Sequence, residues 1–148
     1  MLDPQKIRPP HYFLTLLILT TVLQLICKPD RVVGPAWLGL LPVVAGMAIV
    51  VNGKKLFDNH KTPVRHSETP AALVTTGLFK YSRNPMYLGI ELFLCGIALM
   101  IGTWPFIGLP VVMFLILQGI FIPWEETTMQ NLFKERYTSY RKNVRRWL

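Results

Sequence analysis

The stretch that decides the fold is PMYLGIELFLCGIALMIGTWPFIGLPVVMFLILQGIFIPW, residues 85–124, which contains a single charged side chain, Glu91. Gly102-Thr103 divides it into two apolar runs, 85–101 and 104–124. Each run is at or near the length of roughly 17–25 residues that a helix needs to cross a bilayer. The stretch therefore predicts two membrane-spanning helices joined by a tight turn.

Two further apolar runs, 12–27 and 36–52, precede this pair. The chain has 148 residues, of which 51% are hydrophobic. A soluble all-α protein with buried helices is the alternative, but so short a chain cannot easily bury that much apolar surface. We expect an all-α integral membrane protein, residues 1–148, with about four transmembrane helices in one domain. Gly39 and Gly46 in the second run are small residues, which allow close helix packing.

The charges orient these spans. The formal net charge is +8, and the basic residues concentrate before the first span, in the link 53–84 and in the tail 125–148. Basic segments stay on the cytoplasmic side of a membrane. We therefore expect both termini and the link to be cytoplasmic, as in a bacterial-type inner (plasma) membrane. Such a charge suits anionic headgroups, so the expected partner is the lipid bilayer and not nucleic acid.

The tail combines an apolar and a basic face. Its large apolar and aromatic residues recur at steps of three and four, and basic residues fill the other side: Met129, Leu132, Phe133, Tyr137, Tyr140 and Val144 form the apolar set. This pattern predicts a C-terminal amphipathic helix, residues 125–148, that lies at the membrane interface.

Histidine and cysteine show no metal-binding pattern. His11, His60 and His66 are scattered along the chain, and Cys27 and Cys95 fall inside apolar runs. The two cysteines are expected to be packing residues. We expect no metal.

The third span opens on Ser82-Arg83-Asn84-Pro85. Proline suits the first turn of a helix, because its missing N–H is one that would lack a partner there. A helix N-terminus beside Arg83 is a place where an anion can bind. Tyr87 lies in the first turn and Glu91 one turn deeper on the same face. Taken singly, Arg83 also reads as an interfacial anchor, Tyr87 as an aromatic-belt residue, and Glu91 as a side chain that reaches back to the surface.

Glu125 and Glu126 stand where the last span ends, at the predicted membrane depth of Arg83. Acidic residues are favoured at the start of a helix, which explains the pair without any ligand. The functional interpretation is a carboxylate pair that binds a cationic or hydroxyl-rich ligand at the cytoplasmic mouth. Spacing alone leaves both open.

Three separated motifs follow one another along the chain: LVTTGLFKYSRNPMYLG at 73–89, EE at 125–126 and LFKERYTSYRKNVRRW at 132–147. Together they resemble the isoprenylcysteine carboxyl methyltransferase and phospholipid methyltransferase superfamily, over about residues 62–147. Lys134 stands where glycine is common in that superfamily, and Asn84 where the isoprenylcysteine enzymes generally have histidine.

The resemblance implies a small membrane enzyme that uses S-adenosylmethionine and releases S-adenosylhomocysteine. It places the cofactor between the cytoplasmic ends of the last two spans and the tail. The residues that match its cofactor-binding motifs are Arg83, Asn84, Pro85, Tyr87, Gly89, Glu125, Glu126 and Tyr137. Tyr140 and Arg146-Trp147 match its C-terminal signature. As catalytic residues we expect Arg83, Glu126 and Glu91.

The sequence therefore favours S-adenosylmethionine-dependent methylation of a lipophilic, lipidated or membrane-associated acceptor. O-methylation of an isoprenylcysteine-type carboxylate would use a basic residue such as Arg65, Arg83 or Arg136 to hold the acceptor. N-methylation of a lipid amine would use Glu91 or Glu126 to accept a proton. Two alternatives remain open: an NADPH-dependent membrane reductase of the sterol or steroid type, which carries a similar Arg-x-Pro-x-Tyr element, and a non-catalytic membrane scaffold.

Overall fold

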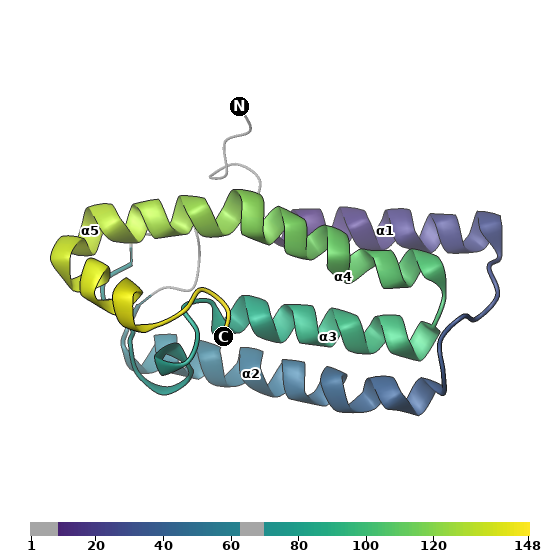
Figure 1. Cartoon of the computed structure of the whole chain (residues 1–148), viewed down its shortest axis with the longest axis horizontal. Helices are drawn as coiled ribbons and strands as arrows, with labels where there is room; N and C mark the ends of the chain where they lie inside the picture. The colour runs from purple at the N-terminus through teal and green to yellow at the C-terminus, as the bar shows by residue number, and fades with distance from the viewer. Residues whose placement is uncertain (1–8, 63–69) are drawn as a thin grey trace.

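The computed structural model describes residues 9–62 and 70–148, and Arg65 and His66 lie outside these ranges. Within the described ranges the chain is helical, with no strand (Figure 1), so the expected all-α fold is confirmed. The elements are α1 (Pro9–Cys27), η1 (Ala36–Gly39), α2 (Leu40–Asn59), η2 (Gly77–Lys80), α3 (Pro85–Ile101), α4 (Trp104–Ile116), the π-helical turn η3 (Leu117–Phe121) and α5 (Ile122–Asn143).

Three helical stretches among the described residues are long and apolar enough to cross a membrane. They are Pro9–Cys27, Ala36–Asn59 and Trp104–Asn143, and Pro85–Ile101 is a shorter apolar helix. Helix α3 lies between α2 and α4, and α1 packs against α4 (Figure 1). The fully buried apolar side chains gather along α3, α4, η3 and the start of α5: Leu94, Met113, Leu117, Phe121 and Ile122.

Helices α2 and α3 cross at glycines. A Cβ atom on Gly46 would lie 2.5 Å from the carbonyl oxygen of Gly89 and 2.6 Å from the backbone nitrogen of Phe93. One on Gly96 would lie 2.7 Å from the carbonyl oxygen of Gly39. Backbone atoms cannot move aside as a flexible side chain can, so only glycine permits this spacing. The close packing predicted from Gly39 and Gly46 is confirmed.

Arg31 closes the far end of α3. Its guanidinium donates hydrogen bonds to the carbonyl oxygens of Leu99, Met100 and Ile101 over 2.6–3.0 Å. These carbonyls are the ones that a helix end leaves without partners, and a cation is favoured there. Gly102, with φ 73°, then ends the helix in the left-handed conformation.

Two boundaries differ from the sequence prediction. Helix α2 continues past residue 52 to Asn59, because no proline or glycine follows Gly53 in that stretch. Helix α4 runs through η3 into α5 without a break, so the span predicted to end at residue 124 continues as one helix. Pro123 would clash with the carbonyl four residues earlier in an α-helix, and the wider π turn before it makes room.

The tail reverses direction at Lys134. This residue has φ 44° and ψ −116°, a backbone conformation that residues other than glycine rarely adopt. Gln130 and Thr138 hydrogen-bond across the reversal at 2.9 Å, and both contact the carbonyl oxygen of Lys134. The second half of α5 then returns towards the start of α3 (Figure 1).

The C-terminal helix predicted over 125–148 is present, but it is shorter and is not continuous. The helix breaks at Lys134 and ends at Asn143, and Tyr137 on its apolar face is only 4% exposed. In this apolar set Tyr137 is buried against the protein itself, whereas Leu132 is 42% exposed. A lysine by itself gives no signal of a reversal, since glycine is the residue that normally marks one. The glycine that is common at position 134 in the superfamily was a hint of this reversal, but it was not used to predict one.

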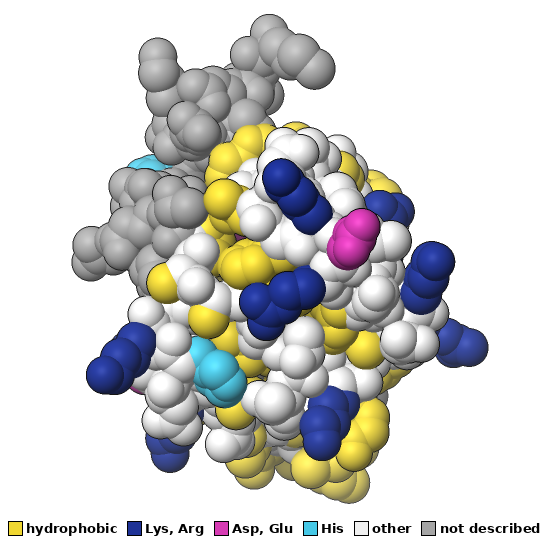
Figure 2. Space-filling model, turned by 90° about the vertical axis from the view of Figure 1, so that its left-hand side faces the viewer, with side chains coloured by type: hydrophobic (Ala, Val, Ile, Leu, Met, Phe, Trp, Pro, Cys, Tyr) yellow, Lys and Arg dark blue, Asp and Glu magenta, His cyan; other side chains and the backbone are white. Residues whose placement is uncertain are grey.

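Basic side chains spread over the end of the bundle where α3 begins (Figure 2). The exposed cations there are Lys54, Lys55, Lys61, Lys80, Lys134, Arg136, Arg141, Lys142 and Arg145. Trp37 and Trp104, 71% and 52% exposed, stand at the opposite end of the spans. Exposed tryptophans are typical of a membrane–water interface.

The glycine crossing yields a stability prediction. We expect Gly46→Ala to lower the melting temperature in detergent, because its methyl group would press on the backbone of α3. Gly108→Ala is the matched control: it is also a helical glycine, but no atom lies within 4 Å of its added Cβ. We expect it to leave stability unchanged or to raise it by up to about 1 kcal/mol through helix propensity. Equal effects of the two substitutions would contradict the crossing.

The reversal yields a second prediction. Lys134→Gly should raise the free energy of unfolding by about 1 kcal/mol, because glycine adopts this conformation without the steric cost that lysine bears. Lys134→Ala removes the same side chain but keeps the strain, and should not stabilise. Thermal unfolding of both variants would check this, and an alanine variant as stable as the glycine variant would refute it.

Candidate active site

A cavity of about 670 Å³ lies at the basic end of the bundle. Its walls come from the starts of α1 and α3, the end of α2, η2 and the segment before it, one residue of α4, and both halves of α5. This volume falls in the range of small-molecule sites, roughly 300–1,000 Å³. One side carries polar groups, and the rest is apolar, including Phe13, Phe57, Ile90, Phe93 and Met113.

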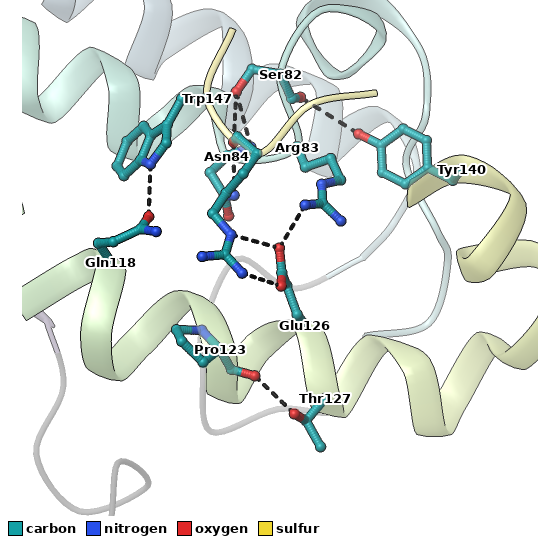
Figure 3. A network of polar contacts seen from close by, with 10 residues as sticks. Ser82, Arg83, Asn84, Gln118, Pro123, Glu126, Thr127, Tyr140 and Trp147 are labelled. Atoms are coloured by element: carbon teal, nitrogen blue, oxygen red, sulfur yellow. Dashed lines mark hydrogen bonds and ion pairs between the residues drawn. The ribbon is translucent and has the colours of Figure 1, made fainter. Parts of the chain in front are cut away.

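A buried carboxylate between two arginines forms the centre of the polar side (Figure 3). Glu126 Oε1 lies 2.9 Å from Arg83 Nη2 and accepts a hydrogen bond from Arg146 Nε at 3.1 Å. Glu126 Oε2 accepts from Arg146 Nη2 at 2.7 Å. The hydrogen bond to Glu126 raises the pKa of Arg146. Helix α5 is thereby joined to the start of α3 and to the tail.

The residues after α5, 144–148, form a strap across the start of α3. The carbonyl oxygen of Arg146 accepts hydrogen bonds from Asn84 Nδ2 at 3.0 Å and Ser82 Oγ at 3.3 Å. The backbone N–H of Arg83 donates to the carbonyl oxygen of Arg145 at 2.9 Å. These contacts hold the turn that carries Arg83 from outside the cavity.

Trp147 fixes the end of the strap on the last span. Its indole Nε1 donates to Gln118 Oε1 at 2.8 Å (Figure 3), and its ring stacks on Phe114 with centroids 5.0 Å apart. Gln118 belongs to the π-helical turn, and such turns often occur at functional sites. The strap is therefore anchored at both of its ends.

Arg83 has hydrogen-bonding capacity to spare. Its side chain is 9% exposed and lines the cavity, yet Nε and Nη1 are buried with no hydrogen-bond partner among the described residues. A buried donor without a partner costs about 1–3 kcal/mol, more when charged. In addition, no side chain caps the N-terminus of α3, which opens on the same cavity. Both features favour binding of an anionic group here.

Tyr87 and Glu125 form the neighbouring wall. The hydroxyl of Tyr87 donates to Glu125 Oε1 over 2.6 Å, and Tyr87 is 8% exposed. Tyr137 and Tyr140 complete the polar side from the returning half of α5. Burial raises the pKa of both, and the charge of Glu126 adds to the rise at Tyr137. Both phenols therefore keep their protons near neutral pH and can donate hydrogen bonds.

The structure brings most of the predicted site residues together at this cavity: Arg83, Asn84, Pro85, Tyr87, Glu125, Glu126 and Tyr137. Gly89 and Glu91 lie elsewhere on α3. Gly89 faces Gly46 of α2, which gives it a packing role. Glu91 is 9% exposed, does not line the cavity, and its Oε1 has no hydrogen-bond partner among the described residues.

Three participants were not predicted from the sequence as site residues. Gln118 is an amide inside an apolar run, a signal that could have marked it. Ser82 belongs to the stretch that opens the third span but was given no role in the site, and its hydroxyl accepts from the Asn84 N–H at 3.1 Å and donates to the strap. Phe13 has no signal, because its place on the cavity depends on how α1 packs against α4.

Comparison with known protein families assigns the chain to a family. The model of the phospholipid methyltransferase family matches residues 35–136, more than half of the chain. The chain belongs to the phospholipid methyltransferase family. The superfamily inferred from the three motifs is confirmed, and the chain is a membrane methyltransferase of a family that acts on lipids.

The phospholipid methyltransferase match covers α2, α3, α4 and α5 up to just past the reversal, and it ends before most of the returning half and before the strap. Among the curated proteins and among the solved structures, no protein matches the chain. Groups of three or more His, Cys, Asp or Glu that could hold a metal ion are not found among the described residues.

The buried carboxylate yields a prediction for stability. Glu126→Gln should destabilise the protein by about 3 kcal/mol, because it leaves the guanidinium of Arg83 buried without a counter-charge. Glu135→Gln, at an exposed position on the same helix, removes the same charge and should have little effect. Thermal unfolding of the two variants in detergent tests this. Equal melting temperatures would show that the ion pairs with Glu126 contribute nothing.

Proposed function

We propose that this membrane protein transfers a methyl group from S-adenosylmethionine to a lipophilic acceptor at the cytoplasmic surface. The observation that carries the proposal is the two-sided cavity. Its polar side presents a buried arginine with unpartnered donors, two carboxylates and three tyrosines, and its other side is apolar. A polar cofactor and an apolar acceptor therefore fit into one continuous space.

The polar side suits each part of S-adenosylmethionine. The unpartnered Nε and Nη1 of Arg83 and the uncapped start of α3 match its carboxylate. Glu125 carries a carboxylate that matches the ammonium group or the ribose hydroxyls. The faces of Tyr87 and Tyr137 match a sulfonium cation or an adenine ring. The residues present fit this cofactor.

The apolar side suits the acceptor. Phe13 of α1, Phe57 of α2, Ile90 and Phe93 of α3, and Met113 of α4 contribute hydrocarbon surface to the cavity. Such a surface favours an apolar chain over a hydrated one. A lipid or a lipidated molecule in the inner leaflet would place its headgroup near the polar side and its chain along this wall.

For this reaction the protein mainly has to position the methyl donor and the acceptor. S-adenosylmethionine supplies a methyl group on a positively charged sulfur, and transfer forms the bond from the acceptor's lone pair as the carbon–sulfur bond breaks. Alignment of two reactants alone contributes about 7–11 kcal/mol in well-oriented systems. The residues around the cavity bind and orient both molecules and keep water away from the apolar side. A carboxylate and an amine are both chemically suitable acceptors.

The ligand that binds at this site distinguishes a methyltransferase from a reductase. We expect S-adenosylhomocysteine to raise the melting temperature of the detergent-solubilised protein in a saturable way, because a ligand that binds only the folded state stabilises it. NADPH at equal concentration should have no such effect. Stabilisation by NADPH and not by S-adenosylhomocysteine would replace the methyltransferase with the reductase, and stabilisation by neither would remove both.

Tyr87 tests where the ligand binds. Tyr87→Phe removes the hydroxyl that holds Glu125, and a hydrogen bond to a charged group is worth about 1.5–3 kcal/mol. We therefore expect the affinity for S-adenosylhomocysteine to fall by about tenfold or more in calorimetric titration. Tyr81→Phe is the matched control, since Tyr81 is 73% exposed and does not line the cavity. An unchanged affinity in Tyr87→Phe would place the ligand elsewhere.

A further inference from the structure

We infer that Arg146 is a positioning residue that builds a carboxylate subsite: it holds Glu126, which in turn holds the guanidinium of Arg83 with two donors free to bind the ligand. The inference rests on the proposed function, because it assigns one part of the S-adenosylmethionine site. Arg146 lies beyond residues 35–136, which match the family.

Glu126 has little capacity left for a ligand. Oε1 is shared by Arg83 and Arg146, Oε2 is bound by Arg146, and the residue is 6% exposed. A carboxylate enclosed in this way orients its partners more readily than it binds a ribose or accepts a proton. The contact of Glu126 with the cavity is therefore made through Arg83.

Arg83 needs such an orientation. Its side chain is long, and an unrestrained guanidinium would sample several rotamers, with an entropic cost of up to about 2 kcal/mol when a ligand fixes it. The ion pair through Nη2 removes that freedom and leaves Nε and Nη1 as the buried donors without partners. The Nε–H and Nη1 point to different edges of the guanidinium, because Cδ lies between them, so each can donate one charge-assisted hydrogen bond to an oxygen of a ligand carboxylate.

Arg146 acts on Arg83 by two routes. Its guanidinium fixes both oxygens of Glu126, and its backbone carbonyl holds the Ser82 hydroxyl and the Asn84 amide on either side of Arg83 (Figure 3). Two guanidiniums on one carboxylate also leave the cluster with a net positive charge. That charge remains available for an anionic ligand group.

Two ligands that differ only in a carboxylate group test the subsite. S-adenosylhomocysteine carries the carboxylate, and 5′-(3-aminopropylthio)-5′-deoxyadenosine is the same molecule without it. We expect the full-length protein in detergent to bind the first at least tenfold more tightly than the second. In Arg146→Ala this ratio should fall to about one, through a loss of affinity for S-adenosylhomocysteine alone.

Two further variants complete the test. Arg145→Ala removes the same charge from the neighbouring exposed position and should keep the wild-type ratio. Arg146→Lys retains the charge but cannot contact both oxygens of Glu126 through two nitrogens, so its ratio should be intermediate. Arg146→Lys also provides the test of the subsite if Arg146→Ala does not fold.

The outcomes separate the two proposals. If neither compound binds the wild-type protein, the methyltransferase site itself is wrong. If both bind with equal affinity, the cofactor site stands and the carboxylate subsite is refuted. If the Arg146 variants weaken both ligands equally, or neither, Arg146 braces the fold or plays no part, and the positioning role is refuted.

Discussion

The cavity depends on one buried carboxylate. Glu126 belongs to the helix that continues the last span, Arg83 belongs to the turn before α3, and Arg146 belongs to the strap. These segments are far apart in sequence, and apolar packing alone would not fix them at this end of the bundle, because the cavity separates them. An ion pair so deeply buried is costly unless its geometry is good. The protein satisfies that condition by giving each oxygen of Glu126 a close partner.

The rest of the bundle supplies a rigid frame for this cluster. The glycines of α2 and α3 bring the two backbones into contact, so that α3 cannot slide or rotate without a clash. On its other side, α3 packs against α4 through fully buried Leu94 and Met113. The start of α3, which carries Arg83 and Tyr87, is therefore held in place by packing along the whole helix.

The sequence was sufficient to predict the class of fold and most residues of the site. Hydrophobic run length and the placement of charge predicted membrane-spanning helices, and the motifs around Arg83 and Glu125-Glu126 predicted a shared site. The path of the tail was not predicted in the same way. A lysine in a glycine-like conformation at 134 reverses it, and Tyr137, from an apolar set typical of an interfacial helix, is buried against the protein itself. The π turn before Pro123 was also not predicted, because a proline within an apolar run indicates that the helix must adjust but not which backbone geometry accommodates it.

The end of the molecule opposite the cavity has a mechanical consequence. There Arg31 joins the α1–α2 link to the last carbonyls of α3, and Gln24 of α1 accepts a hydrogen bond at 2.6 Å from Thr103 in the α3–α4 turn. All the spanning helices are thus connected to one another at this end of the molecule. Any change of angle between the helices that their packing still allows therefore displaces the walls of the cavity most, because these walls lie farthest from the shared contacts.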